Sequence, residues 1–290
     1  MHYSDYKTIL SPKNGMNVYR GCSHGCIYCD SRSACYQFTH DFEDIEVKRN
    51  AVQIFEEQLK RRRKPCMIST GAMTDPYIPL EKELQITRQC LALIERYGFG
   101  INILTKSNLI LRDLDLLQAI HHKTKCVVEI TLTTHDEKLC SILEPNVAST
   151  KERFAVLEIL RDMGIPTVVW LTPILPFIND TKENLVGILD YCIRAKIYGI
   201  IHFSFGTTMR EGSRDYFYQQ LDNHFPGMKK RYQKTFGNNY ICPSPNHREL
   251  SQYFKKTCQS NNIICNDHEV FEYMHTFETK EKQMTIFDLL

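Results

Sequence analysis

Strand-like and helix-like segments alternate from residue 45 to residue 203, and this order leaves few folds open to the chain. The expected strands cover 66–70, 101–105, 126–133, 167–171 and 200–203. The expected helices cover 44–63, 84–97, 111–120, 149–164 and a segment whose apolar stripe runs from 185 to 193. Such alternation builds a parallel sheet with helices outside it. About six units are too few for a closed eightfold barrel of about 250 residues, so a partial barrel and an open doubly wound sheet both fit.

In either fold, function lies at the C-terminal ends of the parallel strands. The candidate positions are the loops at those ends: 22–29, 70–77, 106, 131–135, 173–176 and 205–208. We expect the functional side chains to come from these segments.

The alternating pattern stops near residue 206, which divides the chain into three expected parts. Residues 1–206 form the barrel or sheet. Residues 207–275 are rich in aromatic, basic and amide side chains and have few strand signals, so we expect a helical region packed on the barrel. Residues 276–290 are polar until an apolar ending, and we expect a flexible tail.

Composition excludes several classes of protein. Hydrophobic residues make up 42% of the chain and charged residues 24%, as in ordinary globular proteins. The net charge of +2 excludes a strongly basic protein that holds nucleic acid by bulk electrostatics alone. The sequence has neither an apolar run of about 20 residues nor a secretory signal. We therefore expect a cytoplasmic protein with no role for a membrane.

Three of the twelve cysteines lie in one short loop, where Cys22, Cys26 and Cys29 have the spacing Cys-x3-Cys-x2-Cys. Thiols in a reducing compartment serve as metal ligands, redox groups or small apolar side chains. Three thiolates within eight residues can converge on one soft metal centre. Three further cysteines in the C-terminal region have wide, irregular separations, which favour ordinary thiols over a second metal site: Cys242, Cys258 and Cys265.

Two metals suit the three-cysteine loop. A structural zinc site needs four ligands, and His24 is the nearest candidate for the fourth, although it lies inside the loop. A [4Fe–4S] cluster held by three cysteines would keep one iron open, since clusters bound by protein alone use four. An open iron can bind a cofactor or substrate.

The Cys-x3-Cys-x-aromatic-Cys motif in the first loop resembles that of the radical S-adenosylmethionine (SAM) superfamily. The resemblance implies an α/β fold, a partial (β/α)6 TIM-like barrel with a helical C-terminal extension. It implies two cofactors, SAM and a [4Fe–4S] cluster bound by Cys22, Cys26 and Cys29. It also implies that one electron cleaves SAM to methionine and a 5′-deoxyadenosyl radical. A partner such as flavodoxin or ferredoxin would donate that electron.

Further motifs resemble the branch of this superfamily around spore photoproduct lyase. They are Gly71 to Glu81, Leu104 to Ser107, Glu144 to Asn146 with Arg153, and Pro173 to Pro176. The resemblance implies that Tyr28 lies against the SAM adenine, that Thr74 and Asp75 help to hold SAM, and that Lys106 pairs with its carboxylate. It assigns Thr131 to the same pocket.

The chain departs from this branch at the hydrogen donor. The lyase has a cysteine three residues before the matching aspartate, where this chain has Ala72, and its tyrosine after the third cluster cysteine is Asp30 here. Reversal of the spore photoproduct by the same relay is therefore in doubt. The candidate replacement donors are Tyr77, Cys66 and Cys35, each of which also suits simple packing.

The last residues resemble the short peptide by which bacterial DNA repair and replication proteins bind the sliding clamp. The matching side chains are Gln283, Ile286 and Phe287, and the alternative is that this apolar ending folds on the protein's own core. Two basic clusters, 60–64 and 229–234, are compatible with phosphate contacts or with solvated helix faces.

These features predict a radical SAM enzyme that acts on DNA in a lyase-like repair reaction. One alternative keeps the radical chemistry but has RNA, a peptide or a metabolite as the substrate. The other is a non-enzymatic zinc-binding adaptor with a clamp-binding tail. Neither the substrate nor the hydrogen donor follows from the sequence.

Overall fold

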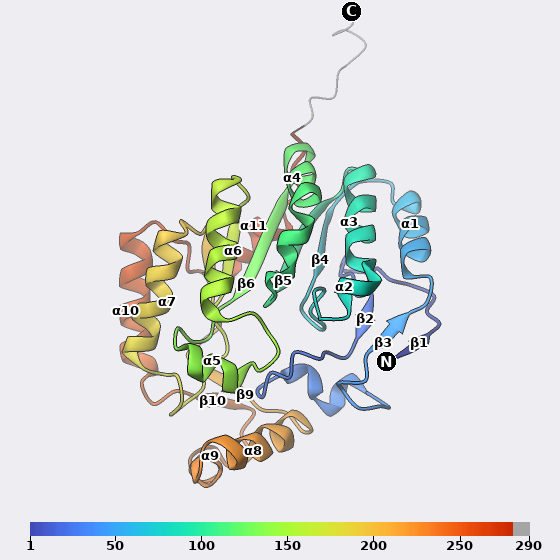
Figure 1. Ribbon diagram of the computed structural model, residues 1–290. Helices are drawn as coiled ribbons and strands as arrows, with labels where there is room; N and C mark the ends of the chain where they lie inside the picture. Colours follow the sequence, from blue (N-terminus) through green and yellow to red (C-terminus); the bar gives the residue numbers. More distant parts are fainter. Residues whose placement is uncertain (281–290) are drawn as a thin grey trace, which may run out of the picture.

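A twisted sheet of five parallel strands is the centre of the computed structural model, which describes residues 1–280 (Figure 1). The strands lie side by side in chain order: β4 (Met67–Thr70), β5 (Gly100–Thr105), β6 (Cys126–Thr131), β7 (Thr167–Trp170) and β8 (Gly199–Ile201). Parallel strands in chain order, each joined to the next through a helix, curve into a barrel. The predicted partial barrel is confirmed, and the open doubly wound alternative is excluded.

The first barrel strand is reduced to a short bridge. The backbone N–H of Met16 donates to the Ser69 carbonyl oxygen at 2.7 Å, and that of Ser69 donates to Asn14 at 3.0 Å. At the opposite edge, the N–H of Ile200 donates to Ile264 at 2.8 Å. Six strand positions therefore exist, with the first too short to form a full strand.

Helices cover the outer face of the sheet (Figure 1). The longer ones are α1 (Ala51–Arg61), α3 (Ile86–Arg96), α4 (Leu114–Lys123), α6 (Thr150–Asp162) and α7 (Lys182–Arg194). The short ones are α2 (Glu81–Leu84), η3 (Asn108–Asp113) and α5 (Glu137–Leu143). Each longer helix buries one apolar stripe against the strands. No described helix has the length and apolar character that a membrane span requires.

The N-terminal part forms a small sheet of its own beside the barrel. Its strands are β1 (His2–Ser4), β2 (Tyr19–Arg20) and β3 (Glu46–Lys48), and two short helical turns follow the cysteine loop: η1 (Asp30–Arg32) and η2 (Ala34–Tyr36). The predicted helix from residue 44 is wrong in its first turns, because Val47 is fully buried between the two neighbouring strands. The helix α1 begins only after Asn50, which takes a left-handed conformation with φ of 54°.

The C-terminal part is largely helical, as expected. It contains α8 (Ser213–His224), α9 (Met228–Phe236), α10 (His247–Ser260) and α11 (Asp267–His275). It also contains an antiparallel pair that the sequence did not indicate, β9 (Gly206–Thr208) and β10 (Ile241–Pro243). The helices α8 and α9 form a hairpin beyond the end of the barrel, while α10 packs beside α7 (Figure 1).

Candidate functional site

The cysteine loop lies between β2 and η1, and backbone contacts hold it against the turn that follows α5. The N–H of Ile27 donates to the Leu143 carbonyl at 3.0 Å, and the N–H of Asn146 donates to the His24 carbonyl at 3.1 Å. Gly21 has a φ of +86°, and a Cβ there would lie 2.5 Å from the Phe42 carbonyl oxygen. Only glycine fits this close approach, so the loop begins at a fixed point.

The spacing of the three sulfur atoms fits a cluster better than a single ion. Within residues 1–280, one group of three such ligand atoms lies entirely within 4.8 Å, and it consists of His2, His40 and Asp44. At least one pair of the three cysteine sulfurs is therefore farther apart than 4.8 Å. Zinc–sulfur bonds of about 2.3 Å would bring tetrahedral thiolates to within about 4 Å of one another. Burial raises the pKa of the Cys22 thiol to about 12, so metal binding would displace its proton.

His24 does not complete a four-ligand zinc site. Its Nδ1 lies 3.1 Å from the Asn146 carbonyl oxygen, and its Nε2 lies 3.5 Å from Asp75 Oδ2. Both ring nitrogens are thus directed at groups other than the cysteines. Burial lowers the pKa of the imidazole, which favours its neutral form beside these acceptors.

Lys106 follows β5 and reaches the cavity that the cysteines line. This cavity, the cysteine cavity, has a volume of about 80 Å³ and contains all three cysteines in its lining. Burial by itself would lower the pKa of Lys106, but the electrostatic effects of Cys26 and Glu144 outweigh it and raise the pKa. The ammonium group therefore stays charged, and it can bind an anion.

Asp75 holds the backbone at Lys106. Its Oδ2 accepts the N–H of Lys106 at 2.8 Å, and its Oδ1 accepts the Thr105 hydroxyl at 2.7 Å and the N–H of Tyr77 at 2.8 Å. Since these bonds use both oxygens, Asp75 fixes the ends of β4 and β5 relative to each other. Its role in this structure is to position Lys106.

A buried ion pair orients Tyr28. The Tyr28 hydroxyl donates to Glu144 Oε1, while Arg153 Nη2 lies 2.5 Å from Glu144 Oε2, and both charged side chains are fully buried. Arg153 Nη1 also donates to the Thr131 carbonyl oxygen at 2.7 Å. The sequence marked Glu144 and Arg153 only through the resemblance, because their pairing across nine residues needs the turn between α5 and α6.

A larger cavity, the main cavity, opens beside the cysteine cavity and has a volume of about 490 Å³. The two share Tyr28, Cys29, Ser31, Gly71, Ala72, Leu104 and Lys106 in their linings. Thr131 also lines the main cavity. Its outer rim, which we call the mouth, carries three exposed apolar side chains, Phe203, Tyr240 and Ile241.

Thr74 lies away from the cysteines. Although it precedes Asp75 directly, it lines a separate cavity beside the N-terminal sheet, together with Tyr19 and Lys48. The structure therefore does not bring Thr74 to the predicted SAM pocket.

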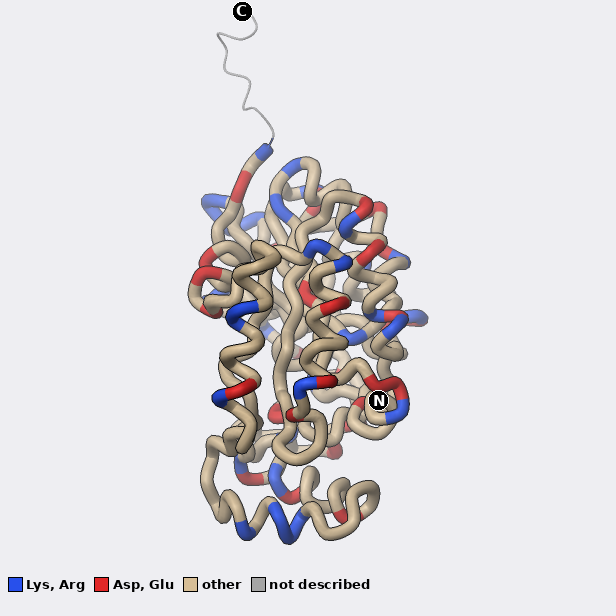
Figure 2. Tube along the Cα trace, turned by 90° about the vertical axis from the view of Figure 1, so that its left-hand side faces the viewer, with Lys and Arg blue, Asp and Glu red and all other residues tan. Residues whose placement is uncertain are grey.

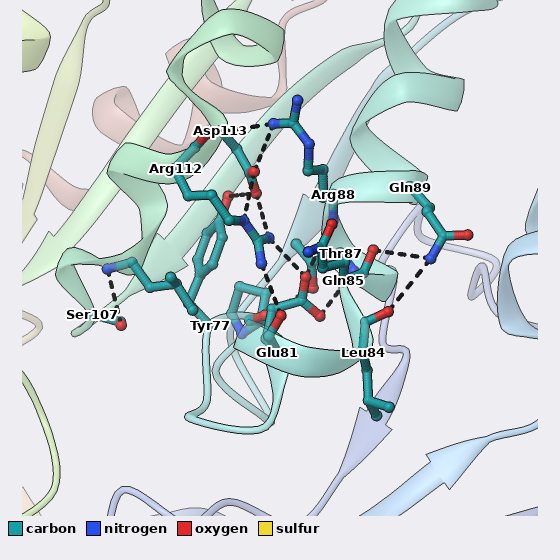
Figure 3. Close-up of polar contacts among 12 residues, drawn as sticks. Tyr77, Glu81, Leu84, Gln85, Thr87, Arg88, Gln89, Ser107, Arg112 and Asp113 are labelled. Carbon is teal, nitrogen blue, oxygen red and sulfur yellow. Dashed lines mark hydrogen bonds and ion pairs between the residues drawn. The ribbon is translucent and has the colours of Figure 1, made fainter.

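Tyr77 is committed to a buried polar network rather than to either cavity (Figure 3). Its hydroxyl donates to Asp113 Oδ2 at 3.1 Å, and Arg112 joins Asp113 to Glu81. Arg88 pairs with the other oxygen of Asp113 at 2.9 Å. This network anchors the loop before α2, and it leaves Tyr77 out of reach of a substrate radical in either cavity.

The candidate thiol donors also lie elsewhere. Cys66 precedes β4, at the N-terminal end of the sheet and therefore opposite the cysteine loop. Cys35 is exposed on η2 and accepts a contact from Arg210 at 3.4 Å. Cys242 and Cys258 belong to two different apolar clusters, so within the described residues the structure does not bring them together as a second metal site.

The barrel and its thiol-lined end define a protein that holds a soft metal centre where parallel strands end. The sequence model of the radical SAM superfamily matches residues 16–207. The chain therefore belongs to the radical SAM superfamily. Its cofactors are accordingly a [4Fe–4S] cluster and SAM, and membership of this superfamily indicates an enzyme.

The chain is also similar to proteins of other organisms and to solved structures. The chain is 28% identical over 248 residues to an uncharacterized protein of Mycobacterium tuberculosis, covering 81% of this chain and 70% of that one. It is 30% identical over 181 residues to an uncharacterized protein of Methanocaldococcus jannaschii, and the match covers 62% of this chain and 66% of that one. A structure of spore photoproduct lyase complexed with dinucleoside spore photoproduct superimposes on this chain with a TM-score of 0.60 at 14% identity. The superposition covers 86% of this chain and 74% of that one.

A second solved structure extends the comparison of the fold. SuiB of Streptococcus suis, bound to the precursor peptide SuiA, superimposes with a TM-score of 0.51 at 15% identity, covering 93% of this chain and 51% of that one. At these identities, the likeness establishes the fold alone.

Proposed function

We propose that this chain is a radical SAM enzyme whose substrate is DNA, in a lyase-like repair reaction. The observation that carries the proposal is the main cavity, which joins the three-cysteine loop to a mouth of exposed apolar side chains. Phe203 is 58% exposed, Tyr240 45% and Ile241 64%. Exposed aromatic side chains at the entrance of a cavity offer stacking surfaces to unpaired bases.

In this proposal, Cys22, Cys26 and Cys29 bind the cluster. When bound, the cluster supplies the electron that cleaves SAM and generates the 5′-deoxyadenosyl radical. Lys106 binds the SAM carboxylate, because it is the charged cation that faces the thiolates. Tyr28, oriented by Glu144, supports the adenine, and Thr131 completes the pocket.

A base within duplex DNA must leave the stack to enter this cavity. Basic side chains beside the mouth support such an approach. Figure 2 shows lysine and arginine along the lowest part of the molecule, where Figure 1 has α9. Lys230, Arg231 and Lys234 are exposed on that helix. Acidic residues also lie on this face, so the two signs of charge are mixed over it.

The hydrogen donor of such a reaction would differ from that of the lyase. Ala72 lines the main cavity where the family's cysteine is expected, and Cys29 is the single thiol among the cavity's described lining residues. Two phenols of that lining are oriented by polar neighbours: Tyr36, 3.4 Å from Asp30, and Tyr240, 2.9 Å from Arg210. Either phenol is a better candidate than Tyr77.

The proposed partner of the tail is the bacterial sliding clamp. Its predicted contacts, Gln283, Ile286 and Phe287, lie outside the described residues. The last described residue, Lys280, donates its N–H to the Lys123 carbonyl at the end of α4. Helices outside a barrel end at the side opposite its catalytic mouth. A tail that leaves from this side could hold a clamp without covering the mouth.

The chemistry is tested with Cys26→Ala in anaerobically reconstituted protein. We expect loss of the cluster and of 5′-deoxyadenosine formation after reduction with SAM. Cys192→Ala, a buried cysteine of α7, serves as the control and should keep both. Colourless protein containing zinc instead of iron would favour the adaptor and contradict the proposal.

The substrate is tested by adding ultraviolet-irradiated DNA, untreated DNA or RNA to the wild-type protein. Greater 5′-deoxyadenosine formation with irradiated DNA, together with restored thymines, would support the repair reaction. If only RNA increases 5′-deoxyadenosine formation, the substrate is RNA, and the DNA proposal is wrong. Removing residues 283–290 should abolish clamp binding while the reaction on short DNA is unchanged.

A further inference from the structure

Glu129 points into the barrel from the middle of β6. Side chains alternate along a strand, and Val128 and Ile130 belong to the apolar core beneath the helices. Glu129 therefore shares the inner face with Val127 and with Thr131 of the main cavity. Its side chain is 4% exposed. A carboxyl group thus lies inside the barrel, one layer below the proposed SAM pocket.

A separate cavity, the floor cavity, surrounds this carboxyl group and has a volume of about 170 Å³. It shares Ala72, Leu104 and Trp170 with the main cavity, so the two are adjacent. The helix α11 borders it through Phe271, Met274 and His275. The two cavities are therefore separated only by side chains that line both.

The polar groups of the floor cavity are incompletely paired. The indole N–H of Trp170 donates to Glu129 Oε2, and this is the hydrogen bond that the described residues make to the carboxyl group. The Ser69 hydroxyl also lines the cavity, and it has no partner in the described part of the chain. Buried polar groups normally have partners, so the Ser69 hydroxyl and the Glu129 carboxyl group are both able to bond a polar ligand in this cavity.

Burial of the Glu129 carboxyl group in its ionised form is energetically unfavourable in this cavity. No lysine or arginine is found among the described residues that line the floor cavity. Burial therefore raises the pKa of Glu129 to about 7, against the opposing effect of the Trp170 hydrogen bond. A buried acid without a cation, kept in a cavity, is typical of a functional group.

We propose that the floor cavity binds a planar ring with an amide-type edge, as in a pyrimidine base, and that Glu129 forms hydrogen bonds with this edge. A protonated carboxyl group can donate to a ring carbonyl and accept from the adjacent N–H. The size fits, since a cavity of about 150 Å³ holds a benzene ring in another protein. The proposal deepens the proposed action on DNA and rests on it for the identity of the ring.

Trp170 makes the site directly measurable, because it is the single tryptophan of the chain. The full-length protein is titrated with thymine and with 1,3-dimethylthymine while its tryptophan fluorescence is recorded. We expect a saturable change with thymine and about tenfold weaker binding of the methylated base, which lacks the N–H. Equal binding of the two bases would overturn the proposal.

Three variants sharpen this test. Glu129→Leu should weaken thymine binding about tenfold, whereas Glu129→Gln should largely preserve it, because the amide also donates and accepts. Glu158→Gln, on the surface of α6, is the control and should change nothing. If Glu129→Leu weakens SAM binding but not thymine binding, the carboxyl group serves SAM, and the proposal is wrong.

The outcome also separates this proposal from the proposed function. If thymine does not bind but irradiated DNA still stimulates SAM cleavage, the floor cavity is not a base-binding site, and DNA remains the proposed substrate. If thymine binding depends on Glu129 but DNA has no effect on SAM cleavage, the floor cavity is a base-binding site, and the proposal of a DNA substrate is wrong.

Discussion

Lys106 is the residue on which the charge balance of the site depends. Its ammonium group faces Cys26 and the Glu144 carboxylate, and Asp75 fixes its backbone. A cation held in this way attracts the carboxylate of a zwitterionic ligand and disfavours uncharged ones.

Replacing Lys106 with methionine should therefore weaken SAM binding about 10- to 100-fold, since hydrogen bonds to charged groups contribute about 1.5–3 kcal/mol. The measurement is SAM affinity in protein of matched iron content. Lys182→Met, on the exposed side of α7, is the control. Unchanged affinity in the Lys106 variant would remove this residue from the SAM site.

Glu129 should make stability depend on pH. Its pKa is raised from 4.5 to about 7 in the folded protein, so the protonated form favours folding. The stabilisation is fully present below pH 4.5 and is lost as pH rises through about 7, by on the order of 3 kcal/mol. His275 is the other titratable group that lines the floor cavity.

Glu129→Gln removes this titration. The difference in unfolding free energy between Glu129→Gln and the wild type should therefore grow in favour of the variant from pH 5 to pH 8. Denaturant unfolding at several pH values measures it. A constant difference would mean that Glu129 titrates normally in the folded protein.

At the scale of elements, α5 and α6 hold the cysteine loop in place from outside. The turn between them carries Glu144, whose oxygens bind both Tyr28 and Arg153. The start of α6 is itself fixed by a capping box between Ser149 and Glu152. The loop and the far side of the barrel are thereby coupled through one ion pair.

Replacing one partner of the Glu144–Arg153 pair should lower the free energy of unfolding more than replacing both partners together. Arg153→Met leaves a buried carboxylate and should lower the free energy of unfolding by about 3–5 kcal/mol. The double variant Glu144→Gln/Arg153→Met should recover part of this loss, and Ser149→Ala should cost only about 1 kcal/mol. Urea unfolding compares the three. Equal losses in the single and double variants would contradict a buried ion pair.

At the scale of the whole molecule, the two ends of the barrel have different surfaces. The cavities open at the C-terminal ends of the strands, beside the hairpin of α8 and α9 (Figure 1). The basic cluster 60–64 follows α1 and precedes β4, so it lies at the opposite end. Of the two basic clusters in the sequence, only that on α9 can meet a substrate at the mouth.

Lys230→Gln/Lys234→Gln should therefore weaken DNA binding and reduce the slope of log affinity against log salt by up to about 2, because both side chains are exposed on α9. Lys60→Gln/Arg61→Gln is the matched control and should leave both unchanged. Binding of a fluorescent oligonucleotide at several salt concentrations measures the effect. Equal losses in both variants would indicate nonspecific attraction by the whole surface.

The order of strands and helices and the spacing of the cysteines were readable from the sequence alone. Both are local properties, since a helical stripe or a three-cysteine loop is complete within a few turns of chain. The superfamily, its cofactors and the choice of a partial barrel over an open sheet came from the resemblance that these features carry, and all three are confirmed. The helix expected from residue 44 was wrong because β3 depends on β1 and β2, which lie elsewhere in the sequence.

The tertiary structure decided which side chains meet. Thr74 and Asp75 are neighbours in the sequence, yet Thr74 lines a separate cavity and Asp75 holds the backbone of Lys106. In the sequence, Glu129 is one residue of an expected strand. In the structure, its side chain points into the barrel and accepts a hydrogen bond from Trp170. Contacts of this kind join residues 30 or more positions apart, and only the packing of the barrel determines them.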